Sequence, residues 1–239
     1  MLARNHPRGR RSITSALLTT AVALAVLTAT GCTATATPEP GADHDPTAAL
    51  WEAIARDDVA SAQQTIDAGA DLESRGEGDA TPLIAATKAG RTEIALALLD
   101  AGADPNAQDA IHDSAFLYAG AEGLDDILRA TLAHGADVAS TNRFGGTALI
   151  PASEHGHVST VRILIDAGVP LDHVNDLGWT AIHEAIVLGD GSADQVTTVR
   201  LLLEAGADPT LADGEGTTPR ELAARAGFDD IVTLLDAAS

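Results

Sequence analysis

From residue 48 to residue 239, apolar residues occur in short segments with helical spacing, and a glycine follows most of these segments. In the segment 160–166, Val161, Leu164 and Ile165 are three or four residues apart, which places their side chains on one face of a helix. The segment 93–100 has the same pattern. The pattern predicts many short helices that pack through small side chains.

The marker residues of this pattern recur at one constant interval, from position 81 to 114, 147 and 180 in the first series. The three series are Thr81, Ser114, Thr147 and Thr180; Gly90, Gly123, Gly156 and Gly189; and Gly69, Gly102, Gly135 and Gly168. In each series the next member, Thr218, Gly227 or Gly206, follows after a longer interval that is again the same for all three. Three series with one period and one shared insertion predict an internal repeat, in which each unit is one supersecondary element.

Each series has a predicted structural role. A Ser or Thr at the start of a helix caps an unpaired backbone N–H, and Pro82 and Pro219 follow two of these hydroxyl residues at the first helical position. Thr218 and Glu221 have the spacing of a capping box. A glycine about nine residues later can end the helix with a positive φ, and a second helix then runs to the next glycine. The repeat is therefore predicted to be helix, turn, helix and loop.

These residues resemble the ankyrin repeat family. The matching stretches include TPLIAATKAGRTEIALALLDAGADPNAQD at 81–109 and TALIPASEHGHVSTVRILIDAGVPLDHVN at 147–175. The resemblance implies an all-α solenoid of about six helix-turn-helix repeats with loop or β-hairpin fingers. The predicted repeats span residues 48–80, 81–113, 114–146, 147–179, 180–217 and 218–239 of a domain at 47–239.

Two repeats depart from the regular pattern. The fifth has five extra residues in 190–195, which predict a longer loop that protrudes between its two helices. The last repeat places Arg220 and Glu221 at positions that are usually less polar, as expected of a solvent-facing cap at the end of a solenoid.

The resemblance implies that a partner protein binds along a concave face, formed by the finger loops and the first helices. The positions at the finger tips are Gly78, Ile111, Phe144, Leu177 and Glu215, and three consecutive tips are apolar. Apolar and Arg anchors ringed by polar groups are typical of interaction hot spots. The candidate partner-binding residues are Ile111, Tyr118, Arg143, Phe144, Glu154, His155, Asp176, Leu177, Trp179 and Glu184. The alternative is that the tips only pack on neighbouring fingers.

The first 46 residues have a different pattern. Four arginines precede an uncharged apolar run at 16–30, the order of a secretory signal peptide, predicted here at 1–31. The run ends in Ala29-Thr30-Gly31-Cys32, which resembles the lipobox of bacterial lipoproteins, although that family usually has Leu at the place of Ala29. The resemblance implies a lipid anchor on Cys32, a flexible stalk at 32–46 and a position at the outer face of the cytoplasmic membrane, in the cell envelope. The alternative is a secreted protein in which Cys32 is a free thiol.

Composition and charge limit the fold classes and the kinds of partner that the chain can have. Aromatic residues are 3% of the chain, which argues against a large β core, and the formal net charge is −21. Without the four arginines that precede Cys32, ten basic residues face 35 acidic ones, a net charge near −25. Such a surface disfavours nucleic acid and favours a partner protein with a basic patch. With one cysteine in the chain, neither an intramolecular disulfide nor a thiolate zinc cluster is possible. We expect a monomer without cofactors.

The predicted function is that of a membrane-anchored, extracytoplasmic protein-binding scaffold without catalytic activity. One alternative is a protective or inhibitory partner of one exported enzyme. Another is a hydrolase or metal-dependent enzyme that uses the acidic loops at 77–79, 190–194 and 213–215, which could also hold calcium. His157, directly after Gly156, and His183 occupy places where the ankyrin pattern itself contains histidine, so a structural role is the favoured interpretation for both.

Overall fold

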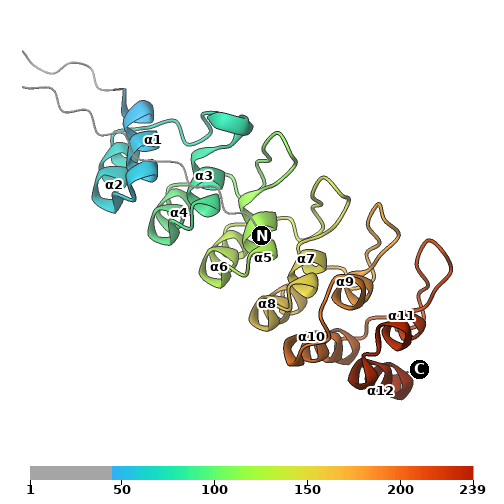
Figure 1. The fold of residues 1–239 in the computed structure, drawn as a ribbon. Coiled ribbons are helices and arrows are strands. Elements are labelled where there is room, and N and C mark those ends of the chain that lie inside the picture. Colours follow the sequence, from blue (N-terminus) through green and yellow to red (C-terminus); the bar gives the residue numbers. More distant parts are fainter. Residues whose placement is uncertain (1–44, 239) are drawn as a thin grey trace, which may run out of the picture. The chain divides into compact units, whose positions relative to one another are not determined.

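The computed structural model describes residues 45–238; the predicted signal peptide, Cys32 and the stalk up to residue 44 lie outside them. In this part of the chain helices occur in pairs, and no strand is present (Figure 1). A 3₁₀ turn, η1 (Glu77–Asp79), lies in the first finger. The six pairs are α1 (Pro46–Arg56) with α2 (Val59–Asp67), α3 (Pro82–Lys88) with α4 (Thr92–Asp100), α5 (Ala115–Ala121) with α6 (Asp125–Ala133), α7 (Leu149–Glu154) with α8 (Val158–Asp166), α9 (Ala181–Val187) with α10 (Ala193–Glu204), and α11 (Pro219–Ala226) with α12 (Asp229–Ala238). The predicted all-α repeat architecture is confirmed, and the fingers are loops without a β-ladder.

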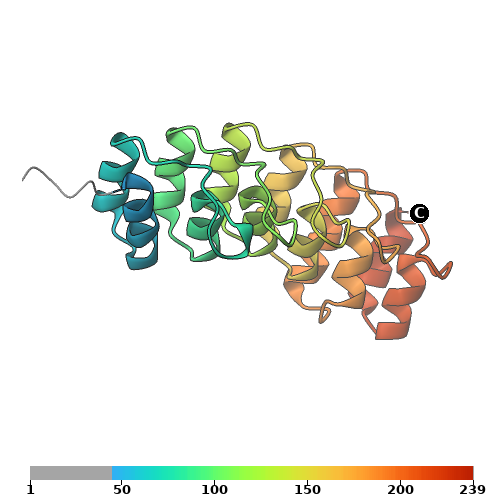
Figure 2. The same cartoon turned by 90° about the horizontal axis from the view of Figure 1, so that it is seen from above.

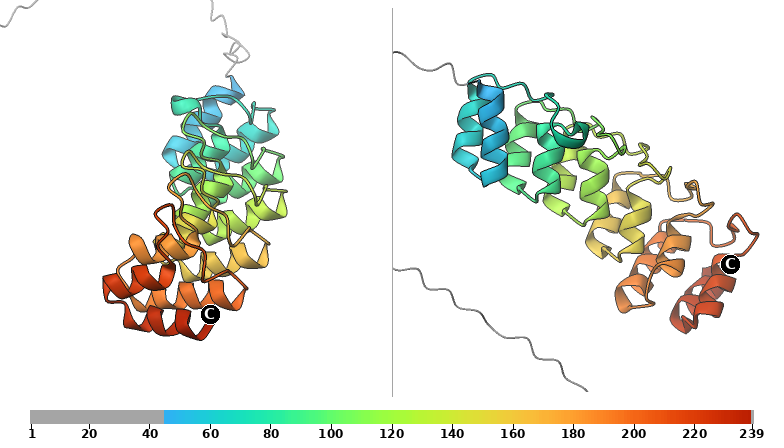
Figure 3. Two further views of the ribbon diagram at one scale, coloured as in Figure 1. Left: turned by 90° about the vertical axis from the view of Figure 1, so that its right-hand side faces the viewer. Right: turned by 45° about the horizontal axis from the view of Figure 1, so that its top comes forward.

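The helix pairs of residues 45–238 stack so that the first helices form one row and the second helices another. Each helix contacts its own partner and the equivalent helix of the next pair. The fingers all project on the side of the first-helix row (Figures 1 and 2). Figure 3 shows that successive fingers lie next to one another along the stack. Residues one repeat length apart in sequence thus become neighbours in space.

Small residues allow the first helices to pack closely. Alanines that recur with the repeat are completely buried on these helices: Ala86, Ala119, Ala152, Ala185 and Ala223. Gly120 of α5 lies so near α7 that an added Cβ would be 2.8 Å from the Cβ of Ala148. Leucines and isoleucines fill the space between the two rows, and Phe116 is the largest fully buried side chain. The core is a continuous layer along the repeats, as in other stacked-repeat folds.

Three of the five predicted hydroxyl caps are formed by the side chain. The hydroxyls of Thr81, Ser114 and Thr218 accept hydrogen bonds from the backbone N–H three residues later, at 3.2–3.4 Å. The capping box of Thr218 and Glu221 is also present. These caps satisfy backbone donors that a helix N-terminus otherwise leaves unpaired.

Thr147 does not cap its helix, so that prediction is wrong. α7 begins at Leu149, and the buried Thr147 hydroxyl has no hydrogen-bond partner among the described residues. The cause is Pro151, which has no N–H to donate to the Thr147 carbonyl, the bond that would begin a helix capped by Thr147. That carbonyl instead accepts from the backbone N–H of Ile150 at 3.1 Å.

The insertion in the fifth repeat lengthens both the loop and the second helix, so the predicted longer loop is present but takes up only part of the extra residues. α10 has 12 residues, whereas α8 has nine. The backbone N–H of Gln195 donates to the Ser192 hydroxyl, which therefore caps the longer helix. Gly191, not Gly189, takes the positive φ here, at 71°, and it lies against Phe228 of the last repeat. Among the loop residues, Gly191 therefore packs on the last repeat, whereas Leu188 and Asp190 are exposed.

The last repeat ends the stack with a polar outer face. Arg220 and Glu221 are exposed, as predicted, and Arg220 forms an ion pair with Asp236 of α12. Within residues 45–238, no helix has both the length and the apolar character needed to cross a membrane.

Candidate functional site

The finger loops hold their tips through one repeated arrangement. In the finger at the end of the third repeat, the backbone N–H of Asn142 donates to the Gly146 carbonyl at 2.9 Å. The Asn142 side-chain oxygen accepts from the backbone N–H groups of Phe144 and Gly146, at 2.9 and 3.0 Å. Asp109, Asn175 and Asp213 do the same in their fingers. A side chain that bonds the backbone in this way mimics a turn, so it fixes the direction of the tip.

Neighbouring fingers are joined by hydrogen bonds. The backbone N–H of Asp176 donates to the Phe144 carbonyl at 2.9 Å, and Nε2 of His173 lies 2.6 Å from the Gly145 carbonyl oxygen. The apolar tips Ile111, Phe144 and Leu177 nevertheless remain 43%, 50% and 57% exposed. Neighbouring fingers therefore link the tips without covering them.

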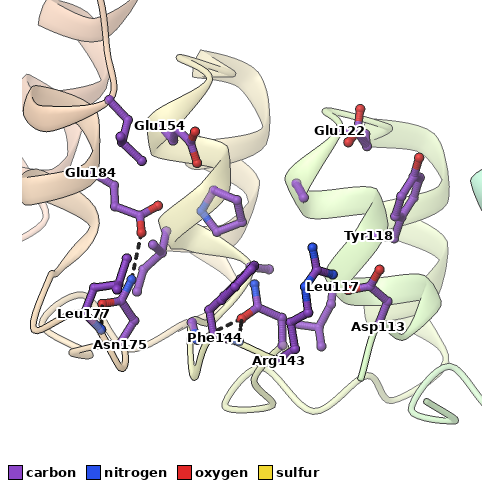
Figure 4. Close-up of a pocket in the computed structure, with 17 residues that line it drawn as sticks. Asp113, Leu117, Tyr118, Glu122, Arg143, Phe144, Glu154, Asn175, Leu177 and Glu184 are labelled. Atoms are coloured by element: carbon purple, nitrogen blue, oxygen red, sulfur yellow. Dashed lines mark hydrogen bonds between the residues drawn. The ribbon is translucent and has the colours of Figure 1, made fainter. Parts of the chain in front are cut away.

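A cavity of about 430 Å³ lies between these fingers and helices α5, α7 and α9 (Figure 4). We call it the central pocket. Its apolar lining includes Leu117, Phe144, Ile150, Pro151, Leu177 and Leu188, and its polar lining includes Asp113, Tyr118, Glu122, Asn142, Arg143, Glu154, Asn175 and Glu184. The walls of the pocket thus contain many apolar side chains, and its charged groups are four carboxylates and one arginine.

Six of the ten predicted binding residues line the central pocket: Tyr118, Arg143, Phe144, Glu154, Leu177 and Glu184. The other four do not. Ile111 is an exposed tip of the neighbouring finger, Asp176 is exposed beside Gly145, and Trp179 is half-buried at the base of its finger, where its carbonyl accepts from Asn175. His155 lines a second, more open cavity of about 480 Å³ together with Glu154, Asp190 and Asp194.

Two further lining residues, Leu188 and Pro151, were not predicted from the sequence, although a signal was present. Leu188 lies one repeat length after His155, at the same place in its repeat, and it is half exposed. Pro151 lies one repeat length after Tyr118 and one before Glu184. The same position in the repeat that identified Tyr118 and Glu184 as candidates therefore also identifies Pro151.

The most perturbed acid of the pocket is Glu184. It is 7% exposed, and its Oε1 accepts a hydrogen bond from the Asn175 side chain at 2.7 Å. Burial raises the pKa of Glu184, the nearby charge of Glu154 raises it further, and the pKa reaches about 7. The Asn175 hydrogen bond stabilises the charged form and offsets part of this effect. Near neutral pH this side chain is therefore about half protonated.

At the opposite end of the pocket, one lysine is paired with two carboxylates. Lys88 donates to Asp109 at 2.6 Å and to Asp113 at 3.0 Å, and its Nζ lies 5.3 Å from the centre of the Tyr118 ring. Burial alone would lower the pKa of Lys88, but the two hydrogen bonds raise it above its ordinary value. Arg143 stacks on the Phe144 ring at 4.5 Å. The basic groups of this region therefore do not neutralise Glu184.

The histidines have structural contacts. Nδ1 of His183 accepts from the backbone N–H of Thr180 at 3.1 Å, and burial lowers the pKa of His183. Nδ1 of His155 lies 2.9 Å from the Ala121 carbonyl oxygen of the preceding repeat. Burial and the adjacent His155 lower the pKa of His157, whose ring meets that of His155 edge to face. In residues 45–238, no three His, Cys, Asp or Glu side chains are grouped so that they could hold a metal ion.

Comparisons with known proteins agree with this architecture. The family model for three ankyrin repeats matches residues 116–213, and the model for one ankyrin repeat matches residues 79–110. The crystal structure of an ankyrin repeat domain from Acinetobacter baumannii AYE is 51% identical, with a TM-score of 0.77, and the match covers 79% of this chain and 96% of that one. A second crystal structure, of an ankyrin repeat protein, is 38% identical, with a TM-score of 0.76 and coverage of 80% and 97%.

A curated relative matches a shorter part of the chain. The ankyrin repeat protein YahD of Escherichia coli (strain K12) is 56% identical over 55 residues. These residues are 23% of this chain and 27% of that protein, so the match spans about a quarter of the relative's length.

Proposed function

The chain belongs to the ankyrin repeat family, and on this premise we propose that it is a non-catalytic scaffold that binds a partner protein with its central pocket and apolar finger tips. Repeats of this family typically mediate protein–protein interactions, and its members are generally scaffolds without catalytic activity. Beyond this general role, we propose the surface that binds the partner, the charge of the partner and the location of the protein in the cell.

The observation that carries the proposal is the exposure of Phe144 and Leu177 at the mouth of the central pocket (Figure 4). Large apolar side chains are costly to expose, and protein interfaces are built from such anchors within a polar rim. The backbone N–H groups of Phe144 and Leu177 donate hydrogen bonds to the side-chain oxygens of Asn142 and Asn175, which hold both tips in place. A surface that is ordered before binding loses less entropy when a partner docks.

The charge of the molecule selects a basic partner. The chain has a formal net charge of −21, and Glu122, Glu154 and Glu184 line the pocket without a Lys or Arg within 4 Å in the described part of the chain. Electrostatic attraction of this kind accelerates association and weakens as the salt concentration rises. Binding of the partner should therefore be salt-sensitive.

The proposed position is the outer face of the cytoplasmic membrane, with a lipid on Cys32 as the anchor. The support is the basic segment, the apolar run at 16–30 and the lipobox-like end at Cys32. Cys32→Ser should move the protein from the membrane fraction to the soluble fraction and abolish incorporation of a labelled fatty acid. If the variant stays in the membrane fraction, lipid anchoring through Cys32 is wrong.

The test of the binding surface is affinity capture of the full chain with a C-terminal tag. The double variant Phe144→Ala/Leu177→Ala should recover at least tenfold less partner than the unchanged protein at low salt. Val174→Ala is the matched control, because Val174 is equally exposed but does not line the pocket. Equal recovery by the double variant and the unchanged protein would rule out this surface as the binding site.

A further inference from the structure

We propose that the central pocket receives one cationic side chain of the partner protein, an arginine or a lysine, between Glu154 and Glu184. This inference rests on the proposed function, because it names the group by which the partner is recognised.

Two carboxylates from neighbouring helices border the same space. Glu154 is the last residue of α7, and Glu184 lies in α9; both line the central pocket (Figure 4). In residues 45–238, no Lys or Arg lies within 4 Å of either carboxyl. The ionisable neighbours of Glu154 are Glu184 itself, with which it shares a side-chain hydrogen bond, and His155, whose Nε2 is 4.0 Å away. Two adjacent carboxyls without a basic partner form a site that an incoming cation stabilises in place of the shared proton.

The remaining walls suit the aliphatic part of such a side chain. Phe144, Leu177, Pro151 and Leu188 line the pocket, whose volume of about 430 Å³ falls within the roughly 300–1,000 Å³ of typical ligand sites. Lys and Arg bury their methylene groups on apolar surface while the charged end reaches polar groups. Apolar walls next to paired carboxylates match both parts of a Lys or Arg side chain.

The basic residues nearest the pocket do not serve as the cation. Lys88 is held by Asp109 and Asp113 at the other end, and Arg143 stacks on the Phe144 ring without an ion pair among the described contacts. The occupant is therefore external, and the charge of −21 favours a basic segment. We commit to a protein side chain instead of a metal ion, because the described residues contain no grouped set of three metal ligands.

Binding of a cation at this place is linked to a proton. Burial, followed by the charge of Glu154, raises the pKa of Glu184 to about 7, and a bound cation lowers it again. The charges that act on Glu184 come from Glu154 of α7 and from His155, which follows it. The charged residues of α10 and α11 are exposed to solvent; they are Asp194, Arg200, Glu204, Arg220, Glu221 and Arg225. Between pH 8 and pH 6, protonation of Glu184 weakens cation binding by up to about tenfold.

The test is an NMR titration of the full chain with synthetic peptides. The probes are four seven-residue peptides of serine, glycine and alanine that differ in the central residue: arginine, lysine, citrulline or leucine. At pH 8, the arginine and lysine peptides should shift the amide signals of Gly146 and Leu188 and bind at least tenfold more tightly than the citrulline and leucine peptides. Their affinity should fall about tenfold at pH 6.

Two variants assign the effect to the carboxylate. Glu184→Gln should weaken the arginine peptide about tenfold at pH 8 and remove most of the pH dependence. Glu204→Gln is the control, because Glu204 is an exposed carboxylate outside the pocket. Glu154→Gln should also weaken binding, and it provides an independent test from α7.

The outcomes separate this inference from the proposed function. Equal binding of the arginine and citrulline peptides, or tighter binding of the leucine peptide, overturns the cation site. Calcium chloride that shifts the same signals at submillimolar concentration and displaces the arginine peptide also overturns it, in favour of a metal site. If partner capture still depends on Phe144 and Leu177 in those cases, the proposed function stands; if capture is unaffected as well, both proposals fall.

Discussion

Glu184→Gln should increase the free energy of unfolding by about 3 kcal/mol at pH 8 and by only about 0.2 kcal/mol at pH 4. The carboxyl of Glu184 has an ordinary pKa of 4.5, and burial, with the charge of Glu154, raises it to about 7 in the folded protein. The folded state therefore keeps a proton that the unfolded chain releases between these two values. As the pH rises from 4.5 to 7, stability is lost, and above pH 7 the full cost of burying the charge is present. Glutamine is neutral at every pH and does not carry this cost.

The assay is urea unfolding at pH 4, 5, 6, 7 and 8, followed by circular dichroism and by tryptophan fluorescence. The fluorescence comes from Trp179, in the finger that precedes α9, and from Trp51 in α1, so it follows unfolding at both places in the stack. The difference between the variant and the unchanged protein isolates one group, because all other carboxyls titrate in both. Glu122→Gln is the matched control: Glu122 is exposed, and its replacement should change stability by less than about 0.5 kcal/mol.

Two results would refute the reasoning. A gain in stability that is the same at pH 4 and pH 8 would show that packing of the amide, and not removal of a buried charge, is responsible. A loss at pH 8 would show that the carboxylate contributes more through the hydrogen bond from Asn175 than its burial costs.

Three further predictions test the structure elsewhere. In urea titrations, Thr147→Val should leave the free energy of unfolding unchanged or raise it by up to about 1 kcal/mol, because the buried Thr147 hydroxyl has no partner among the described residues. Thr81→Val should lower the free energy of unfolding by about 1 kcal/mol, because it removes a helix cap. Equal effects of the two substitutions would contradict this reasoning. Lys88→Met should cost roughly 1–3 kcal/mol at pH 7, and less in acid, because Lys88 helps to hold the pKa of Asp109 below its ordinary value and this contribution is lost once Asp109 is protonated; a cost that does not change with pH would contradict the ion pair with Asp109. In thermal unfolding, Gly191→Ala should cost about 1–3 kcal/mol more than Gly168→Ala. Both glycines have positive φ, but only at 191 would the new Cβ meet a side chain, at 2.5 Å, so equal costs would mean that this contact yields.

The repeat architecture could be predicted from the sequence because the same capping residues and glycines recur in each unit. The constant step in hydroxyl and glycine positions places the helices, turns and fingers. It also predicts which residues share a face, so that Tyr118, Phe144, Leu177 and Glu184 could be assigned to one surface. Where one residue breaks the local rule, the prediction fails. Pro151 removes the bond that Thr147 needs, and part of the insertion before α10 joins the helix because Ser192 caps it.

The depth and chemistry of the central pocket could not be predicted in the same way. Tyr118, Pro151 and Glu184 occupy equivalent positions in three successive repeats, and the pocket results from how these three different side chains fill one layer. The sequence identifies Glu184 as a candidate binding residue but does not predict its burial. Its burial follows from the neighbouring finger, where Asn175 bonds both the tip and the carboxylate. Such a contact depends on distances between repeats that periodicity does not contain.

Because of its ion pairs, chemical modification of Lys88 can report on local opening of the structure. The chain contains a single lysine, and activated esters acylate only the uncharged form of an amine. Although burial alone would lower the pKa of Lys88, hydrogen bonds to Asp109 and Asp113 raise it, so the closed finger keeps the amine charged and shielded. Acylation therefore requires the finger to detach from α3. The rate at which Lys88 is labelled thus measures how frequently the finger at 109–113 detaches from α3, without any substitution in the chain.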